Sequence, residues 1–458
     1  MKVLICGAGL VGMNIASYLA RGGNDVTVID QRPELTQQLA ESLDIQGITG
    51  FASEPDVLNR AGAEDADMLI AVTQTDEINM IACQIAHSLF GVPTKIARVR
   101  RQSYLEPRWQ DLFSRDHLPI DEVISPEVEV ARAIHRRLDV VGALDATPFV
   151  DDKVRLMAVR CEPDCPVLDT PLRQLTYLFP DLHITIVAIH RDDATFMPSG
   201  DDQLLVGDEV HFIVDTAHVA RAMHALGYED EPAERVLIAG GGNIGFYLAA
   251  MLEETRAPGS IKVIETNPTR AHRLAEDLRR TLVLQGDARD LDLLAEAGAS
   301  GADAMVTVTN DDEVNVMASL LAKHVGCRRA FALVNHASYR SLIGSLGIDV
   351  AINPRETTVS SVLQHTRRGR IKAVRSIRDG AAEVYEAEVL ETSQLAGRSL
   401  REAKLPKDLL VGAVVHGDQV MIARGDTVIR PHDRVVLATG AAGAKHVEKL
   451  FAVRVDYF

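Results

Sequence analysis

The sequence predicts an α/β protein in which two doubly wound parallel sheets are each followed by a small α+β domain. Three observations carry this prediction. A Gly-x-Gly-x-x-Gly segment follows a short apolar run at residues 7–12 and again at 240–245. Each segment opens a stretch of alternating strand-like and helix-like patterns, and each half of the chain ends in short strands broken by Gly-Asp turns. The chain therefore contains one two-domain unit twice.

The first strand leads directly into the glycine segment. The apolar run 3–5 is typical of a strand buried on both faces, and residues 13–20 read as a helix. Gly7 permits the tight turn, Gly9 lets the backbone approach a pyrophosphate, and Gly12 packs the helix against the strand. A pyrophosphate would then sit at the helix N-terminus, where free N–H groups and the helix dipole favour negative charge.

An acidic residue ends the second predicted strand, which spans residues 25–29. Asp30 lies 18 positions after Gly12, close to the spacing at which an acid accepts a hydrogen bond from a ribose hydroxyl. An acid there favours NAD or an adenosine nucleotide over NADP. The alternative for Asp30 is a solvated strand end. Together the strand, glycine loop and acid predict a Rossmann-like sheet.

The second half repeats the first. RVLIAGGGNIG at 235–245 matches KVLICGAGLVG at 2–12, and Glu265 falls opposite Asp30. Residues 301–323 match 64–86, and the strand-rich tails 185–214 and 410–438 match each other. We therefore expect sheet domains at 1–141 and 232–366, and small domains at 142–228 and 367–458. Polar, Gly-rich or Pro-rich composition predicts linkers near 142–149, 228–234 and 366–371.

Composition narrows the function classes. The formal net charge is −17 with no long basic tract, which argues against nucleic acid as a main partner. No run of 18 or more apolar residues occurs, and the N-terminus enters a strand by residue 3, so we expect neither a membrane span nor a signal peptide. Five scattered cysteines predict no disulfide framework and no zinc or other metal site.

The motif Ala-Asp-x-x-Ile/Val-x-Val-Thr-x-x-Asp-Glu-x-Asn occurs in both halves, at 66–79 and 302–315. With the two glycine-loop sheets and their small domains, it resembles the tandem RCK or KTN domains that regulate potassium conductance. Over essentially all 458 residues the arrangement resembles the regulatory subunit of Trk-type potassium uptake systems. The resemblance implies NAD(H) and ATP or ADP as cofactors, and a membrane-embedded potassium-conducting partner of Trk or Ktr type. It also implies a homotetramer, peripheral at the cytoplasmic face of the inner membrane.

The resemblance also implies the binding residues. The first pocket maps onto Gly7, Ala8, Gly9, Leu10, Val11, Gly12, Asp30, Thr73, Gln74 and Arg98. The second maps onto Gly240, Gly241, Gly242, Asn243, Ile244, Gly245, Glu265, Asp287, Thr309 and Asn310. Thr73 follows the predicted strand 68–72 and so lies at the carboxyl end of the sheet, where such folds bind ligands. Arg98 could reach a phosphate or stack on a base, with surface salt bridging as the alternative.

Two other function classes agree less well with the sequence. An NAD-dependent oxidoreductase needs a proton donor or acceptor beside the nicotinamide. His87 lies within a helical pattern, His117 and His135 lie among charged residues, and no separate catalytic domain remains, so we expect no enzyme. A scaffold with vestigial pockets is disfavoured because both halves keep three glycines and the acid.

Several further segments have two interpretations. The basic stretches 97–101 and 365–370 could bind anionic head groups or the partner, although scattered salt bridges are the simpler account. The helices expected at 126–138 and 354–365 are better partner candidates, with capping of the sheet as the alternative. Acids at Asp192, Asp193, Asp201 and Asp202 suggest a cation site, but turn acids are the commoner explanation.

The two pockets differ in charge. Family members usually have Gly-Asp-Ala after the third strand, which the second half keeps at 286–288, whereas the first half has Gly50-Phe51-Ala52-Ser53. Arg98 in turn falls opposite Leu333. We therefore predict that one pocket favours NAD(H) and the other ATP or ADP. Site-resolved titration with the two nucleotides tests this, and identical preferences at both sites would contradict it.

Overall fold

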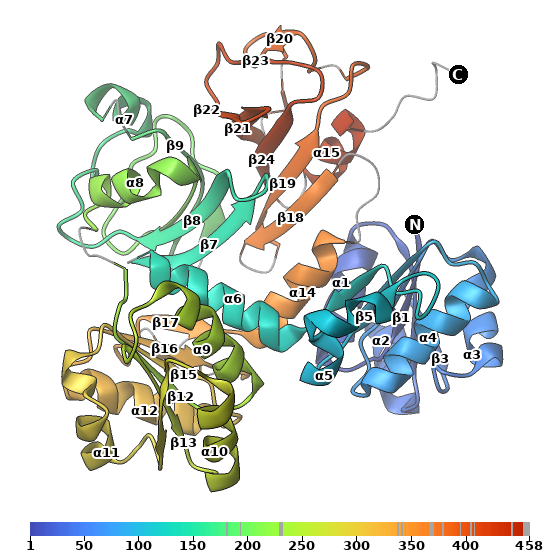
Figure 1. The fold of residues 1–458 in the computed structure, drawn as a ribbon. Coiled ribbons are helices and arrows are strands. Elements are labelled where there is room, and N and C mark those ends of the chain that lie inside the picture. The colour runs from blue at the N-terminus through green and yellow to red at the C-terminus, as the bar shows by residue number, and fades with distance from the viewer. Residues whose placement is uncertain are drawn as a thin grey trace. The chain divides into compact units, whose positions relative to one another are not determined.

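The structure is a computed structural model. It describes residues 1–451 except 141, 180–181, 193, 229–231, 337–338, 340–341, 344, 366–370, 378–379, 394, 404, 407 and 441–442. The chain forms two compact units, residues 1–134 with 234–366, and residues 135–233 with 367–458. The first unit holds both large sheets and the second holds both small domains (Figure 1). The four domain boundaries expected above stay predictions.

The first unit contains two parallel six-stranded sheets with the same strand order, β3-β2-β1-β4-β5-β6 and β14-β13-β12-β15-β16-β17. This order confirms the doubly wound fold in both halves. The first sheet and its helices are β1 Lys2–Cys6, α1 Leu10–Arg21, β2 Asp25–Asp30, α2 Pro33–Ser42, β3 Gln46–Thr49, α3 Pro55–Arg60, β4 Met68–Ala71, α4 Asp76–Ser88, β5 Thr94–Arg98, α5 Gln102–Leu105, β6 Glu122–Ile124 and α6 Pro126–Asp139. The second comprises β12 Val236–Ala239, α9 Asn243–Thr255, β13 Ile261–Glu265, α10 Pro268–Asp277, β14 Leu282–Gln285, α11 Leu291–Glu296, β15 Ala304–Thr307, α12 Asp312–His324, β16 Arg329–Leu333, β17 Val350–Ile352 and α14 Pro354–Gln364.

The central strands form because their side chains are apolar on both faces. In β1, Val3 and Ile5 pack into a core with α1, while Leu4 and Cys6 pack into a second core on the opposite face. The cysteines of the chain are free and buried, as expected without a disulfide framework. No helix among the described residues is long and apolar enough to cross a membrane.

Helix α14 belongs to the second half but packs against the first. Its Val362 and Leu363 are buried in the core that contains Ile15 and Leu19 of α1. Figure 1 shows α14 beside α1. The helix therefore does more than cap its own sheet, and its N-terminal residues are carried toward the first glycine loop.

The second unit contains two antiparallel five-stranded sheets, ordered β10-β9-β11-β8-β7 and β18-β19-β24-β21-β22. The first small domain comprises β7 Ala143–Phe149, β8 Val154–Arg160, α7 Leu172–Leu178, β9 Ile184–Arg191, β10 Ala194–Phe196, β11 Glu209–Asp215 and α8 Val219–Ala225. The second comprises β18 Ile371–Ile377, β19 Ala382–Glu388, β20 Arg398–Ser399, β21 Leu409–His416, β22 Gln419–Ile422, β23 Val428–Ile429, β24 Arg434–Gly440 and α15 Ala444–Phe451.

One predicted linker is wrong. Residues 143–149 form the edge strand β7 rather than a connection, and they pair with β8. Pro148 is tolerated because an edge strand has one side on which no ladder hydrogen bond is required. Of the other predicted linkers, 229–231 and 366–370 lie outside the described residues.

The two small sheets of this unit pack face to face. Leu156, Val187 and Ile213 of the first share one core with Val384 and Val436 of the second. At Gly412 the approach is so close that a Cβ atom would lie 2.3 Å from Cδ1 of Ile213.

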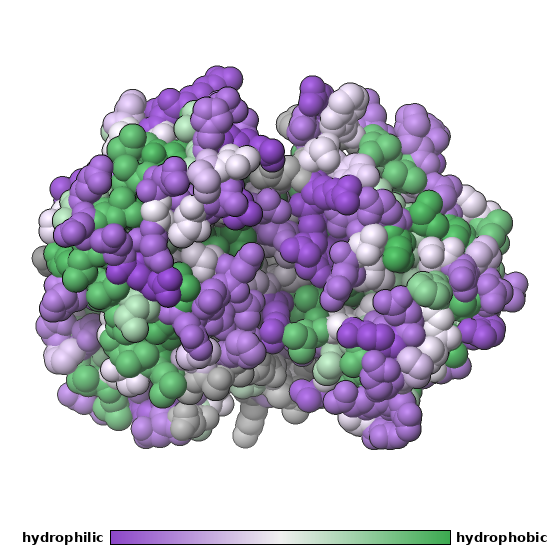
Figure 2. Space-filling view, turned by 90° about the horizontal axis from the view of Figure 1, so that it is seen from below, coloured by the Kyte–Doolittle hydropathy of each residue, from purple (hydrophilic) through white to green (hydrophobic). Residues whose placement is uncertain are grey.

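The face of the molecule in Figure 2 is mostly hydrophilic, with hydrophobic residues in separate groups between the polar ones.

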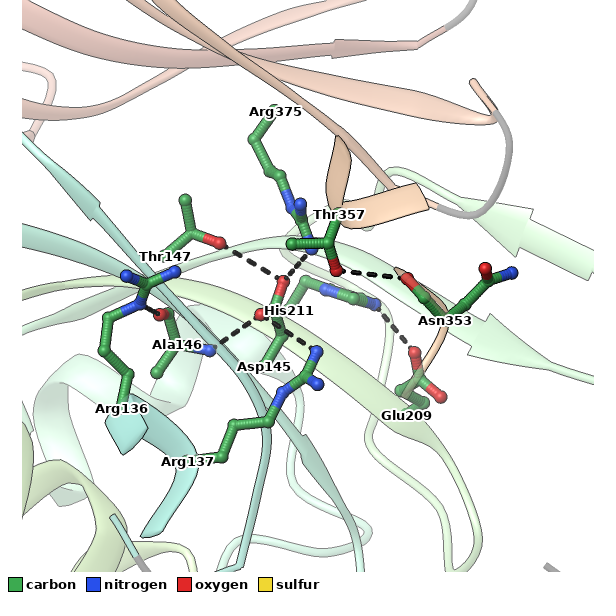
Figure 3. Close-up of polar contacts among 10 residues, drawn as sticks. All are labelled: Arg136, Arg137, Asp145, Ala146, Thr147, Glu209, His211, Asn353, Thr357 and Arg375. Atoms are coloured by element: carbon green, nitrogen blue, oxygen red, sulfur yellow. Dashed lines mark hydrogen bonds and ion pairs between the residues drawn. The ribbon is translucent and has the colours of Figure 1, made fainter. Parts of the chain in front are cut away.

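A partly buried carboxylate also joins the small domains (Figure 3). Asp145 in β7 is 2.8 Å from Nη2 of Arg375 in β18 and 3.3 Å from Nη2 of Arg137 in α6. It also accepts hydrogen bonds from the Ala146 N–H at 2.9 Å and the Thr147 hydroxyl at 3.3 Å. Burial by itself would raise the pKa of Asp145, but Arg375 and Arg137 outweigh that effect and hold the pKa well below its usual range.

We expect Asp145→Ala to lower the free energy of unfolding by roughly 2–4 kcal/mol at neutral pH, because it leaves two mostly buried arginines without their shared partner. An unfolded Asp has a pKa of about 3.9. Since the folded-state pKa is lower, the contribution of Asp145 is complete above that pH and is lost as the pH falls below it. Denaturant unfolding of wild type and variant from neutral to acidic pH measures both effects.

The matched control is Asp418→Ala. Asp418 pairs with Lys153 but its side chain is fully exposed, so its removal should leave the unfolding free energy nearly unchanged. Equal destabilisation by the two substitutions would show that the Asp145 network is no stronger than a surface pair.

Candidate functional site

The first glycine loop opens into a cavity of about 530 Å³ at the carboxyl ends of the first sheet. Residues that follow strands of the second sheet, among them Asn310 and Asn335, line it as well. Most of the predicted first-pocket residues line it, namely Gly7, Gly9, Leu10, Val11, Asp30, Thr73, Gln74 and Arg98. Ala8 and Gly12 do not line it, because both are buried. Phe51, which corresponds to Asp287 of the second half, also lines the cavity.

The glycines have distinct geometric roles. Gly7 has φ +111°, a conformation that disfavours any residue with a Cβ atom. A Cβ on Gly12 would lie 1.8 Å from the Gly7 carbonyl oxygen, so the helix can approach the strand only with glycine there. A Cβ on Gly9, by contrast, would meet no atom within 4 Å and would project into open space. The second loop repeats this pattern, with φ +105° at Gly240 and a 2.0 Å clash at Gly245.

The two acids brace the glycine loops. Asp30 accepts hydrogen bonds from the N–H groups of Ala8 at 2.7 Å and Arg32 at 3.0 Å, and it still lines the cavity. Glu265 accepts from the N–H groups of Gly241 and Asn267, each at 2.8 Å. Its side chain is buried and lies outside the linings of both loop cavities.

The Asp-Glu-x-Asn motif fixes the strand ends that surround the cavity. The Asn79 carboxamide accepts from the N–H and hydroxyl of Thr73 and donates to the Arg98 carbonyl at 2.9 Å. Asp76 accepts from the N–H groups of Arg100 and Arg101. Asn315 and Asp312 make the corresponding bonds in the second half, to Thr309, Leu333, Asn335 and His336.

Arg98 is a partly buried cation in the wall of the first cavity. Its Nε atom is buried without a hydrogen-bond partner, which is costly unless something else satisfies it. Burial and then the neighbouring Arg100 lower the pKa of Arg98. Arg101, in the same basic stretch, forms a surface salt bridge instead: its Nη1 atom lies 3.2 Å from Oε1 of Glu77.

The second glycine loop borders a cavity of about 340 Å³. Gly241, Gly242, Asn243, Ile244 and Asn310 of the predicted second pocket line it, whereas Gly240, Gly245, Glu265, Asp287 and Thr309 do not. Thr309 lines the first cavity instead. Asp287 is paired with Arg289 at 2.6 Å and lies outside the linings of both loop cavities.

Several charged lining residues were not predicted. Arg32, Arg100, Glu127 and Arg355 line the first cavity, and Arg100, Glu127, Arg270 and Arg273 line the second. Arg100 lies in the basic stretch 97–101, so a signal existed there. Glu127 and Arg355 directly follow the prolines that begin α6 and α14, but nothing in the local pattern shows that they face a cavity.

Other candidate residues are accounted for locally. No group of three potential ligands is placed to hold a metal ion in the described part of the chain. Asp201 pairs with Arg173, and Asp202 accepts hydrogen bonds from the N–H and hydroxyl of Ser199, as turn acids do. Asp193 and most of the basic stretch 365–370 lie outside the described residues.

Two switch-point sheets with glycine loops, each followed by a small domain, define a tandem protein of the RCK fold. The chain is similar to the RCK domain of GsuK, with a TM-score of 0.58 and 16% identity over 99% of this chain and 95% of that one. It is also similar to the GsuK channel, at a TM-score of 0.60 and 17% identity over 99% and 79% of the two chains. A GsuK channel bound to NAD gives a TM-score of 0.58 at 17% identity over the same shares.

Sequence relatives define the family. The TrkA-N domain matches residues 3–126 and 236–354, and the TrkA-C domain matches 156–227 and 384–452. The Trk system potassium uptake protein TrkA of Azorhizobium caulinodans is 51% identical over 458 residues, the whole of both chains. That of Halomonas elongata is 42% identical over 462 aligned positions, again the whole of both. The chain belongs to the TrkA family of potassium uptake proteins, which confirms the resemblance and makes it a transport protein rather than an oxidoreductase.

The two glycines of the first loop should respond differently to the same substitution. Gly12→Ala should destabilise the fold by about 1–3 kcal/mol, because the methyl group clashes with the Gly7 carbonyl. Gly9→Ala should stay within about 1 kcal/mol of wild type, because its methyl group meets only open space. Thermal or denaturant unfolding of the two variants measures the difference, and similar losses in both would contradict the loop geometry.

Proposed function

We propose that this chain is the nucleotide-binding regulatory subunit of a Trk-type potassium uptake system. The observation that carries this proposal is the Arg98 guanidinium, whose buried Nε lacks a partner in the wall of a cavity bounded by a glycine loop. A partly buried cation beside free backbone N–H groups is suited to a phosphate.

The start of α1 supplies those N–H groups. Gly9 is the N-cap residue, and no side chain caps the helix. The first-turn N–H groups have no partner within the helix and point toward the cavity side of the loop. The second helix, α9, starts in the same way after Gly242. Both sheets therefore offer a phosphate cradle, and one is proposed to take NAD(H) and the other ATP or ADP.

The proposed partner is a membrane-embedded potassium-conducting subunit, bound from the cytoplasmic side by a homotetramer of this chain. The relatives are named for potassium uptake, which supports such a partner. A nucleotide can shift an equilibrium only by its difference in affinity between two arrangements.

Helix α6 runs from the wall of the first cavity to the arginines that contact Asp145 and Ala146. Its first residues, Pro126 and Glu127, line the first cavity, and its last turns hold Arg136 and Arg137, which bond to Ala146 and Asp145. The helix is continuous from Pro126 to Asp139.

Potassium or rubidium uptake at low external potassium tests the function. In cells that lack this chain, wild type should restore uptake and Gly9→Ala combined with Gly242→Ala should not, because each methyl group enters a cavity without touching the fold. Wild type and the double variant must both be shown to be expressed and folded.

The control variant is Gly301→Ala, whose Cβ would meet only the tip of Arg235, at 3.3 Å and outside both cavities. It should restore uptake like wild type. Normal uptake without any chain, in cells shown to lack a redundant system, would overturn the proposed role.

A further inference from the structure

The two crossover helices begin with residues of opposite charge at the same position. Ser125-Pro126-Glu127 opens α6, and Asn353-Pro354-Arg355 opens α14. The repeat thus places an acid in one half where the other half has an arginine. If the two cavities were equivalent, this exchange would have no consequence for their ligands.

The helix starts do not reach the two cavities equally. Arg355 lines the first cavity, together with Pro354 and Thr358, because the far end of its helix is packed on α1 of the first half. It does not line the second cavity. Glu127 lies in the wall common to both, where its Oε1 atom is 2.9 Å from Nε of Arg100. The first cavity therefore gains a cation from the second half.

The two cavities differ in how many of their arginines are not paired with an acid. In the first cavity Arg98 and Arg355 form no ion pair with any acid in the described part of the chain, while Arg100 is paired with Glu127. The second cavity is lined by neither Arg98 nor Arg355, and its Arg270 lies 3.6 Å from Glu265. Leu333 and Asn335, which correspond in the second half to Arg98 and Arg100, line the first cavity. Arg273 of the second cavity is exposed, so water and salt screen its charge.

The wall common to the two cavities also carries a negative charge. The second oxygen of Glu127 is buried without a hydrogen-bond partner, as is the Tyr247 hydroxyl of α9. Burial and then Glu127 raise the pKa of Tyr247 to about 12, which places the negative charge of Glu127 near the helix that begins at the second glycine loop. Because Glu127 lines both cavities, the difference between them for an anionic phosphate lies in Arg98 and Arg355, which line the first cavity and not the second.

We propose that Arg355, supplied by the second half, makes the first cavity the site for the more highly charged nucleotide, a nucleoside triphosphate. The second cavity, which neither Arg98 nor Arg355 lines, then takes the dinucleotide, whose pyrophosphate carries less charge. This inference rests on the proposed nucleotide binding. It adds which cavity takes which class of ligand and names Arg355 as the residue that selects by charge.

Hydrogen–deuterium exchange of the full-length protein resolves the two sites. ATP and NADH are titrated separately, and protection is followed in peptides that contain residues 7–12 and 240–245. In wild type, ATP should protect the 7–12 peptide at lower concentration than the 240–245 peptide. In Arg355→Glu, the ATP concentration for half-protection of 7–12 should rise at least about tenfold, as expected for the loss of a charge-assisted contact. The NADH concentration for half-protection of 240–245 should change less than about threefold.

Arg21→Glu is the matched control. Arg21 is an exposed residue at the end of α1, away from both cavities, so it makes the same change in net charge without touching a lining. It should leave both titrations unchanged. If Arg355→Glu fails to fold, Arg355→Gln should give the same selective loss of ATP protection, with a smaller shift.

Three results would overturn the inference: ATP protecting 240–245 first, an unchanged ATP titration in both Arg355 variants, or equal losses for ATP and NADH. Absence of protection by either nucleotide in wild type would be a different result, because it would remove the proposed nucleotide binding as well.

Discussion

Asn79 has no solvent exposure, and its side-chain amide makes four hydrogen bonds, to the N–H, hydroxyl and carbonyl of Thr73 and to the Arg98 carbonyl. These bonds tie the end of β4 to the end of β5. The position of the Arg98 backbone, and hence the wall of the first cavity, depends on that tie. Because a buried amide is costly to leave unpaired, the Asn79 side chain and the two strand ends must adopt their positions together. Asn315 imposes the same constraint on the second sheet.

The large sheets were readable from sequence because every feature that builds them is local. An apolar strand, a glycine loop and an amphipathic helix occupy adjacent positions, and the duplication displays each of them twice. Strand β7 was not readable, because Pro148 and the polar residues around it are as typical of a linker as of an edge strand. What distinguishes the two is pairing with β8, which no local pattern encodes.

The residues of the site likewise fall into those that local sequence predicts and those that depend on contacts between distant segments. Gly9, Asp30, Thr73 and Arg98 follow directly from strand ends, and they do line the first cavity. Arg355 comes to that cavity only because Val362 and Leu363 bury themselves against α1, a contact between segments more than 300 positions apart in the sequence. Glu265 shows the opposite case, a residue that sequence correspondence assigns to the site although it does not line the cavity. It matches Asp30 in the alignment of the halves, yet its side chain is buried against its own loop and lies outside the second cavity.

Glu127 and Arg355 occupy corresponding places in two copies of one unit that are joined in a single chain. Had the unit remained separate and assembled as a two-fold dimer, symmetry would have required the same residue at both places, two acids or two arginines facing one another. Covalent joining removes that requirement, since each copy is then encoded separately and can mutate independently. The opposite charges at the starts of α6 and α14 are a difference that only a fused pair can hold within one molecule.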